Sequence, residues 1–163
     1  MEKTLKSEAI LQYAHIWRVF TRLVLDFDER SWFCTGRKAT TPARLSFHIL
    51  QATKYYLEDT SVVAFASGKS FAANSETSNE AALPSRSDIV ASIQEFGQIT
   101  ERWIATMELS STNHAFPWAG NSKLGVVIFL LKHNVFHLGE LSSLLNESKH
   151  GEAQDHYVQA LEG

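Results

Sequence analysis

The sequence predicts an all-α protein built as a four-helix bundle with one long crossover loop. Four segments carry apolar residues at the 3.6-residue spacing of amphipathic helices, and no strand-like alternation competes with them. A long segment at 67–84, rich in Ser, Asn, Ala and Gly, separates the second helical segment from the third. Four amphipathic helices with one long connection are typical of a bundle. We expect one domain over residues 1–163, with a core at about 7–147 and a tail at 148–163.

The first helix is expected from about Ser7 to Glu29. Ser7 is a suitable N-cap because its hydroxyl can accept a hydrogen bond from a backbone amide of the first turn. A connector over 31–40, with Gly36 as a break, follows this helix. The apolar stripe that predicts it consists of Ile10, Tyr13, Ala14, Trp17, Phe20, Val24 and Phe27.

The second helix opens at Thr41-Pro42, since Thr is a good N-cap and Pro suits the first helical position. We expect it to end near Asp59, with His48 on the same stripe as its apolar residues. The short apolar stretch 62–66 either extends this helix or forms a loop that packs on the bundle.

The third helix is expected to start between Ser85 and Ser87, and the fourth to run from about Ser122 to Glu147. The tail after the fourth helix is either a short terminal helix or frayed. The residues expected to face inward from the third helix are Ile89, Ile93, Phe96, Ile99, Trp103 and Met107.

Charge and composition narrow the class of protein. The net charge is −3 and the basic residues are scattered, which argues against nucleic acid as a partner. The single Cys34 makes no internal disulfide, and we expect it to be a small buried side chain. The first residues lack the apolar core of a signal peptide, and the apolar run 124–131 is too short to cross a bilayer. We therefore expect a cytoplasmic protein with no membrane partner.

Two histidines one helical turn apart, His133 and His137, are the most informative residues of the chain. Residues at i and i+4 lie on one face of a helix, and imidazole is the commonest side-chain metal ligand. His48 of the second helix is the candidate third ligand, because bundles build metal sites from side chains on facing helices. Three protein ligands leave coordination positions open, as in catalytic metal sites. We expect the face that carries the pair to be largely apolar and buried, with Phe136 on it.

The alternative interpretation is that the three histidines bind no metal and are hydrogen-bonded core residues. For His48 alone, a core histidine held by a hydrogen bond is the commoner case, and for the pair alone the two readings are about even. Taken together, three buried imidazoles side by side cost desolvation unless something satisfies them, which favours metal. Glu140, one turn beyond His137, would orient an imidazole, act as a general base or supply a fourth ligand; a surface carboxylate is equally expected.

The remaining histidines are expected away from the site. We expect His15 at the surface or rim of the bundle, and His114, His150 and His156 in solvated loops or in the tail. Aromatic residues that would line a pocket, although such residues at helical spacing are more often core, are Tyr55, Trp17 and Trp103.

The segment Thr41-Pro-Ala-Arg-Leu-Ser-Phe-His48-Ile-Leu-Gln, together with His133-x-x-x-His137-x-Gly-Glu-Leu, resembles the DinB/YfiT-like family. The members of this family are four-helix bundles regarded as candidate metalloenzymes. The resemblance covers about Leu11 to Glu147. It implies that His48, His133 and His137 hold a divalent metal such as Zn²⁺ or Ni²⁺, with water at the open positions, and that the protein is a dimer. Characterised relatives include transferases and isomerases that use low-molecular-weight thiols.

These expectations support two functions of different kinds. The first is a metal-dependent enzyme that acts on a small molecule, either hydrolase-like or as a thiol S-transferase, because a metal on three histidines polarises a carbonyl or activates a thiol. The alternative is a non-catalytic metal-binding protein, serving as a stress-related binding or interaction protein. A histidine triad alone does not choose between them.

Overall fold

A computed structural model of the chain describes residues 1–36, 40–71 and 83–161, and it is mostly helical, with 68% helix and almost no strand. The all-α class predicted from the sequence is therefore confirmed. The long helices are α1 (Glu2–Asp26), α3 (Pro42–Glu58), α4 (Arg86–Thr106) and α5 (Lys123–Ser148). The short elements are α2 (Glu29–Trp32), β1 (Val63–Ala64), β2 (Ser70–Phe71), η3 (Pro117–Ala119) and α6 (His156–Gln159).

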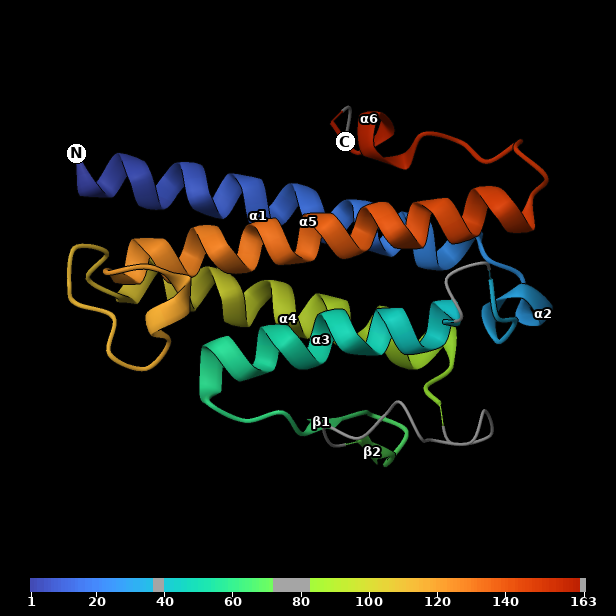
Figure 1. Ribbon diagram of the computed structural model, residues 1–163, viewed down its shortest axis with the longest axis horizontal. Helices are drawn as coiled ribbons and strands as arrows, with labels where there is room; N and C mark the ends of the chain where they lie inside the picture. The colour runs from blue at the N-terminus through green and yellow to red at the C-terminus, as the bar shows by residue number, and fades with distance from the viewer. Residues whose placement is uncertain (37–39, 72–82, 162–163) are drawn as a thin grey trace.

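The four long helices lie side by side (Figure 1). α1 packs against α4 and α5, and α3 packs against the same two helices, so that the α1/α4 pair lies opposite the α3/α5 pair. The core fills the space between the two pairs. Its largest fully buried side chains on the long helices are Tyr13, Phe20, Leu23, Phe47, Ile49, Leu50, Ile89 and Ile104.

α3 and α4 start at the side-chain caps that the sequence predicted. The Thr41 hydroxyl accepts a hydrogen bond from the Arg44 amide at 3.2 Å, with Pro42 at the first helical position. Ser85 and Asp88 form a capping box, in which each side chain accepts from the backbone N–H of the other residue. Both caps satisfy amide groups that a helix start leaves without partners.

The start of the first helix was predicted wrongly. α1 begins at Glu2 rather than at Ser7, and it ends at Asp26. Ser7 lies inside the helix, where its hydroxyl donates to the Lys3 carbonyl at 3.1 Å, one turn back. A serine side chain satisfies either a cap or a carbonyl of the preceding turn, so its presence alone does not mark a helix start. The residues after Asp26 form the separate helix α2, which the Asp28 side chain caps.

The apolar stretch 62–66 packs on the helices and does not extend α3. Asp59 ends α3 in the left-handed conformation at φ 53°, and β1 then pairs antiparallel with β2. Val63 and Phe65 are buried. Of the predicted crossover loop at 67–84, residues 72–82 lie outside the described part of the chain, as do 37–39 of the expected connector and 162–163 of the tail.

The tail ends in a short helix that lies along α1. The Arg18 side chain donates from Nε to the Ala160 carbonyl at 3.2 Å, and a His15 ring nitrogen lies 3.1 Å from the Tyr157 carbonyl. His156 Nε2 lies 2.8 Å from an Asp26 carboxylate oxygen. Of the two alternatives for the tail, the short terminal helix is therefore the one observed.

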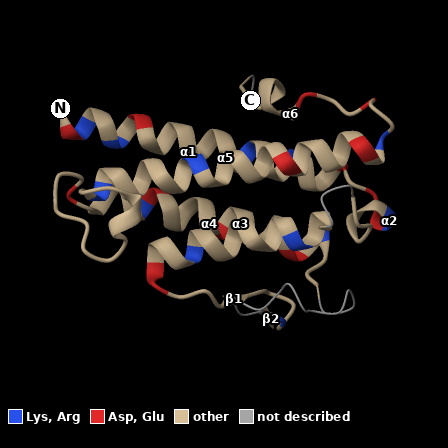
Figure 2. Cartoon of the chain, in the orientation of Figure 1, with Lys and Arg blue, Asp and Glu red and all other residues tan. Residues whose placement is uncertain are grey.

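Charged residues of both signs are spread along the long helices (Figure 2). α5 carries few charges, and by length and composition it would be apolar enough to cross a membrane, with a hydropathy of 1.3 in its most apolar stretch. The core helix of a soluble protein passes the same test. In this chain, the inner face of α5 is buried against α1 and α3.

Candidate metal centre

The structure brings His48, His133 and His137 together between α3 and α5. One ring nitrogen of each residue lies within 4.8 Å of those of the other two, a grouping that could hold a metal ion. The ring centroids are 5.2 Å apart for His48–His133, 4.6 Å for His48–His137 and 4.4 Å for His133–His137. Metal–imidazole bonds are about 2.0–2.1 Å long, so all three rings would reach one ion after shifts of about an ångström.

His137 is oriented by a carboxylate. Its Nδ1 lies 2.8 Å from Oε2 of Glu140, one turn further along α5, and both side chains are largely shielded from solvent. A neutral imidazole that donates from Nδ1 carries its lone pair on Nε2. This is the carboxylate–imidazole arrangement that commonly fixes the ring orientation of a metal-binding histidine.

His133 is oriented by a hydrogen-bonded chain that crosses from α5 to α3. The Thr53 hydroxyl donates to the Ile49 carbonyl at 2.8 Å, so its oxygen is left to accept from the Asn134 amide at 3.1 Å. The amide nitrogen of Asn134 is thereby directed to Thr53, and its oxygen faces His133 Nδ1 at 3.3 Å. Nδ1 of His133 must then carry the proton, which leaves the lone pair on Nε2.

Sequence reasoning missed Asn134 and Thr53, which are both fully buried. A signal was present for Asn134. It stands four residues after Leu130 and four before Leu138, on the stripe of α5 that faces the core. A buried amide needs hydrogen-bond partners, so an Asn on such a stripe next to a candidate ligand indicates a positioning residue.

The environment keeps two of the three imidazoles neutral. Burial, reinforced by the neighbouring His137 and His133, lowers the pKa of His48 from 6.5 to about 4. Burial also lowers the pKa of His133, against the opposing effect of its Asn134 hydrogen bond. At neutral pH both rings have a lone pair available, which is the form that binds a metal.

The expectation that the histidine face is largely apolar and buried holds only in part: Val126, Leu130 and Leu144 are buried, but the histidines and Phe136 are not. All three histidines are half-buried, and Phe136 is 63% exposed while its ring contacts His137 at 5.1 Å between centroids. The buried face of α5 is the neighbouring stripe that carries Leu130, Asn134 and Leu138. The half-buried position leaves the site accessible from solvent.

Two of the other histidine predictions, and that for the cysteine, were also wrong. His15 and His156 are buried, since α1 and α6 cover each other there, and His156 pairs with Asp26. Cys34 is exposed in the segment after α2. His114 and His150 are exposed, as expected. The contact between His156 of the tail and Asp26 of α1 joins residues 130 positions apart, which a local sequence pattern does not reveal.

Comparisons of the chain with models of protein families, with curated proteins and with solved structures found no match.

The lowered pKa of His48 predicts a pH-dependent stability when metal is chelated. In the unfolded chain His48 regains its ordinary pKa near 6.5, so between pH 6.5 and 4 the unfolded state binds a proton that the folded state does not. The free energy of unfolding should therefore fall as the pH drops through this range, by roughly 1–2 kcal/mol after allowance for solvent screening.

Urea denaturation with excess chelator at pH 7 and pH 4.5 measures this effect. A His48→Gln variant should lose much of the pH dependence, and His133 supplies part of the remainder. The exposed His114→Gln variant is the control and should behave as the wild type. An unchanged pH dependence in His48→Gln would contradict the expected burial effect.

Proposed function

We propose that the chain is a DinB/YfiT-like four-helix bundle, with the segment 67–84 as its long crossover, that binds one divalent metal and acts on a small molecule. The ligands are His48, His133 and His137, and Zn²⁺ or Ni²⁺ is the metal. The reaction is hydrolase-like or a thiol S-transfer, with a low-molecular-weight thiol among the candidate substrates. We further propose that the protein works as a cytoplasmic homodimer.

The observation that carries this proposal is the convergence of three imidazoles, two of which are positioned by hydrogen bonds to Nδ1. Two of the three have Nδ1 engaged, by Glu140 and by Asn134, so that Nε2 remains for an ion. A cluster serving only as a hydrogen-bonded core would be expected to bond ring to ring; among the described residues, the ring hydrogen bonds of this cluster go to Asn134 and Glu140 instead. Imidazole donors suit Zn²⁺ and Ni²⁺ better than the hard cations Mg²⁺ and Ca²⁺.

When bound, the metal would supply a Lewis acid that polarises a carbonyl group or favours the thiolate form of a thiol. The chain itself provides the positioning. Glu140 holds His137 and, through its carboxylate, stabilises positive charge that develops on that ring. Phe136 offers an exposed apolar surface beside the histidines, against which the non-reacting part of a small substrate would pack.

The test begins with protein purified without a His tag. Elemental analysis should find about one equivalent of Zn or Ni per chain, or uptake of one equivalent on titration. Conjugation of glutathione or cysteine to chlorodinitrobenzene, in which a C–S bond forms and chloride and a proton leave, and hydrolysis of p-nitrophenyl esters would be assayed with and without chelator. Chelator-sensitive turnover supports the enzyme. Metal binding without turnover of any such probe favours the non-catalytic alternative, and absence of metal uptake contradicts both.

A Glu140→Gln substitution should weaken metal binding by about 10–100-fold, because it removes the charge that orients and polarises His137. Competition with a chromogenic chelator gives the affinity. Glu95→Gln, an exposed carboxylate on α4, is the matched control and should leave the affinity unchanged. Equal affinities for the two variants would show that the Glu140 contact plays no part in metal binding.

A further inference from the structure

A groove of about 410 Å³ lies between α1 and α4, on the side of the molecule opposite the histidines. None of the three histidines lines it. Its volume lies in the range of small-molecule sites, which are mostly apolar clefts with a few polar groups that fix orientation. The apolar part of its lining consists of Ile10, Tyr13, Ala14, Trp17, Ile93 and Gly97.

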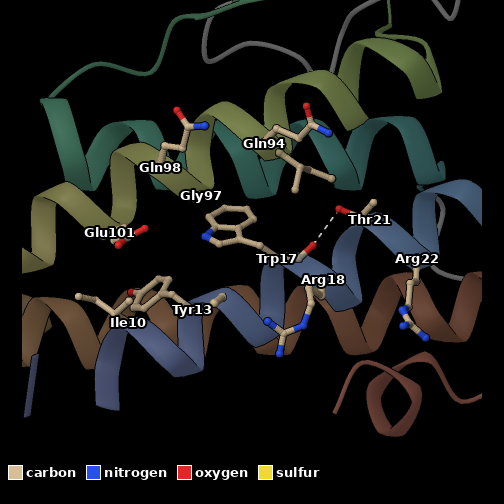
Figure 3. A pocket seen from close by; sticks show the side chains of 12 residues that line it. Ile10, Tyr13, Trp17, Arg18, Thr21, Arg22, Gln94, Gly97, Gln98 and Glu101 are labelled. Atoms are coloured by element: carbon tan, nitrogen blue, oxygen red, sulfur yellow. Dashed lines mark hydrogen bonds between the residues drawn. The ribbon is translucent and has the colours of Figure 1, made fainter. Parts of the chain in front are cut away.

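Trp17 occupies the middle of this groove, with Gly97 of α4 across from its indole (Figure 3). The side chain is 6% exposed, and Phe20 and Phe96 contact its ring at centroid distances of 6.3 and 6.5 Å. Among the described residues, none accepts a hydrogen bond from its Nε1–H. A buried N–H without a partner is destabilising, so a ligand atom that accepted from it would recover that loss.

The direction of the indole places this donor within the groove. Figure 3 shows Nε1 pointing along the groove toward the end where Ile10, Tyr13 and Glu101 lie. Glu101 is exposed and on the helix opposite, so its side chain is free to turn aside and admit an acceptor. By contrast, the indole N–H of Trp32 donates to the Pro84 carbonyl and that of Trp118 to the Tyr56 hydroxyl.

The rim of the groove carries charges of both signs. Arg18 and Arg22 come from α1, whereas Glu101 comes from α4 together with the neutral carboxamides of Gln94 and Gln98. Both arginine side chains run away from the indole, and Arg18 donates to the Ala160 carbonyl of the tail. The Glu101 carboxylate lies at the end toward which Nε1 points, so it disfavours an anionic acceptor and favours an uncharged one. The aromatic side chains of Trp17 and Tyr13 in the lining favour a planar ring, and its acceptor atom must lie in the plane of the indole, because Nε1–H points in that plane.

We propose that the α1/α4 groove is a second binding site, which takes an uncharged, planar heteroaromatic compound that accepts a hydrogen bond from Trp17 Nε1. The acceptor atom of the ligand lies in the plane of the indole, and its ring lies at the end of the groove where Ile10 and Tyr13 are found. This site is separate from the metal centre and does not depend on the proposed reaction.

Gly97 provides a way to close the groove. A Cβ added there would lie 3.7 Å from Trp17 Cδ1, an ordinary contact, and because Gly97 lines the groove, the rest of a larger side chain would extend into it. Gly97→Leu should therefore fill the site in a folded protein. Ala91→Leu makes a similar change at an exposed position of α4 outside the groove and is the matched control.

The experiment titrates ¹⁵N-labelled protein, in excess chelator, with quinoline and with naphthalene. The two probes share size and shape, but only quinoline carries an acceptor. The Trp17 indole N–H resonance, assigned by its loss in Trp17→Phe, should shift with quinoline. The ratio of the quinoline to the naphthalene affinity should be about tenfold higher in the wild type than in Trp17→Phe, because only the wild type offers the donor.

Gly97→Leu should abolish binding of both probes, and Ala91→Leu should bind them as the wild type does. The proposal is overturned if the affinity ratio is the same in wild type and Trp17→Phe, or if Gly97→Leu still binds quinoline at the Trp17 resonance. It is equally overturned if wild-type protein binds neither probe and sedimentation shows that Gly97→Leu dissociates a dimer, since a second copy of the chain would then cover the groove.

Discussion

The His48→Ala variant is expected to bind Zn²⁺ or Ni²⁺ more than about 100-fold more weakly than the wild type. Loss of an outer contact to a metal-binding histidine already costs 10–100-fold, and the removal of a ligand itself costs more. His48 is the cleanest ligand to remove, because it makes no hydrogen bond within the described chain and its loss leaves no polar partner unsatisfied. Isothermal titration of chelator-stripped protein measures the change.

Two further variants test whether the loss of metal affinity is specific to the three-histidine cluster. His133→Ala, on the facing helix, should weaken binding by a similar factor, because all three rings serve the same ion. His114→Ala removes an exposed loop histidine and should bind as the wild type. Circular dichroism of each variant checks that the helices remain. Wild-type affinity in His48→Ala, or an equal loss in His114→Ala, would show that the three-histidine cluster is not the metal site.

The Trp32→Ala variant is expected to lower the free energy of unfolding by about 3–5 kcal/mol. Trp32 is fully buried, contacts the Phe27 ring edge-on at a centroid distance of 5.9 Å, and donates from Nε1 to the Pro84 carbonyl at 3.0 Å. The substitution leaves a large cavity and deprives a buried carbonyl of its donor. Urea denaturation followed by circular dichroism gives the difference.

Trp32→Phe separates the two contributions, since it keeps most of the packing and removes the hydrogen bond; a loss of about 1–3 kcal/mol is expected. Trp118→Ala is the control for removal of a tryptophan as such. That residue is 58% exposed, so its loss should cost about 1 kcal/mol or less. A cost below about 1.5 kcal/mol for Trp32→Ala would contradict the view that this residue anchors α2 to the start of α4.

The starts of α3, α4 and α5 were predictable from the sequence, because each follows a Thr or Ser that precedes a run of residues with helical spacing. Thr41 and Ser85 cap α3 and α4, and the sequence located both. α1 starts after Met1 with no side-chain cap, so the first serine inside the helix was mistaken for its start. The sequence did not predict the β1/β2 pair, because strands of two residues are too short to show an alternating pattern.

The three histidines were predictable because their spacing on one helix and their position on another are local facts. Their exposure was not, since α5 is apolar nearly all round and its buried stripe had to be chosen by the packing of α1 and α3. Asn134 and Thr53 lie 81 residues apart, and only the fold brings their side chains to the hydrogen bond behind His133.

The chain of hydrogen bonds from His133 through Asn134 and Thr53 to Ile49 has a consequence for how the protein would handle its metal. It ties α3 to α5 with buried groups that need no ion. In small zinc domains the metal creates the fold, and chelation unfolds the chain. In this protein, the side chains of the three-histidine cluster are held in place without an ion, so a metal should bind to and leave a chain that stays folded. Chelation should then lower the melting temperature only by removing the stabilisation that metal binding adds. With the proposed metal bound, such a protein would exchange it reversibly, and its occupancy would follow the free concentration of the ion.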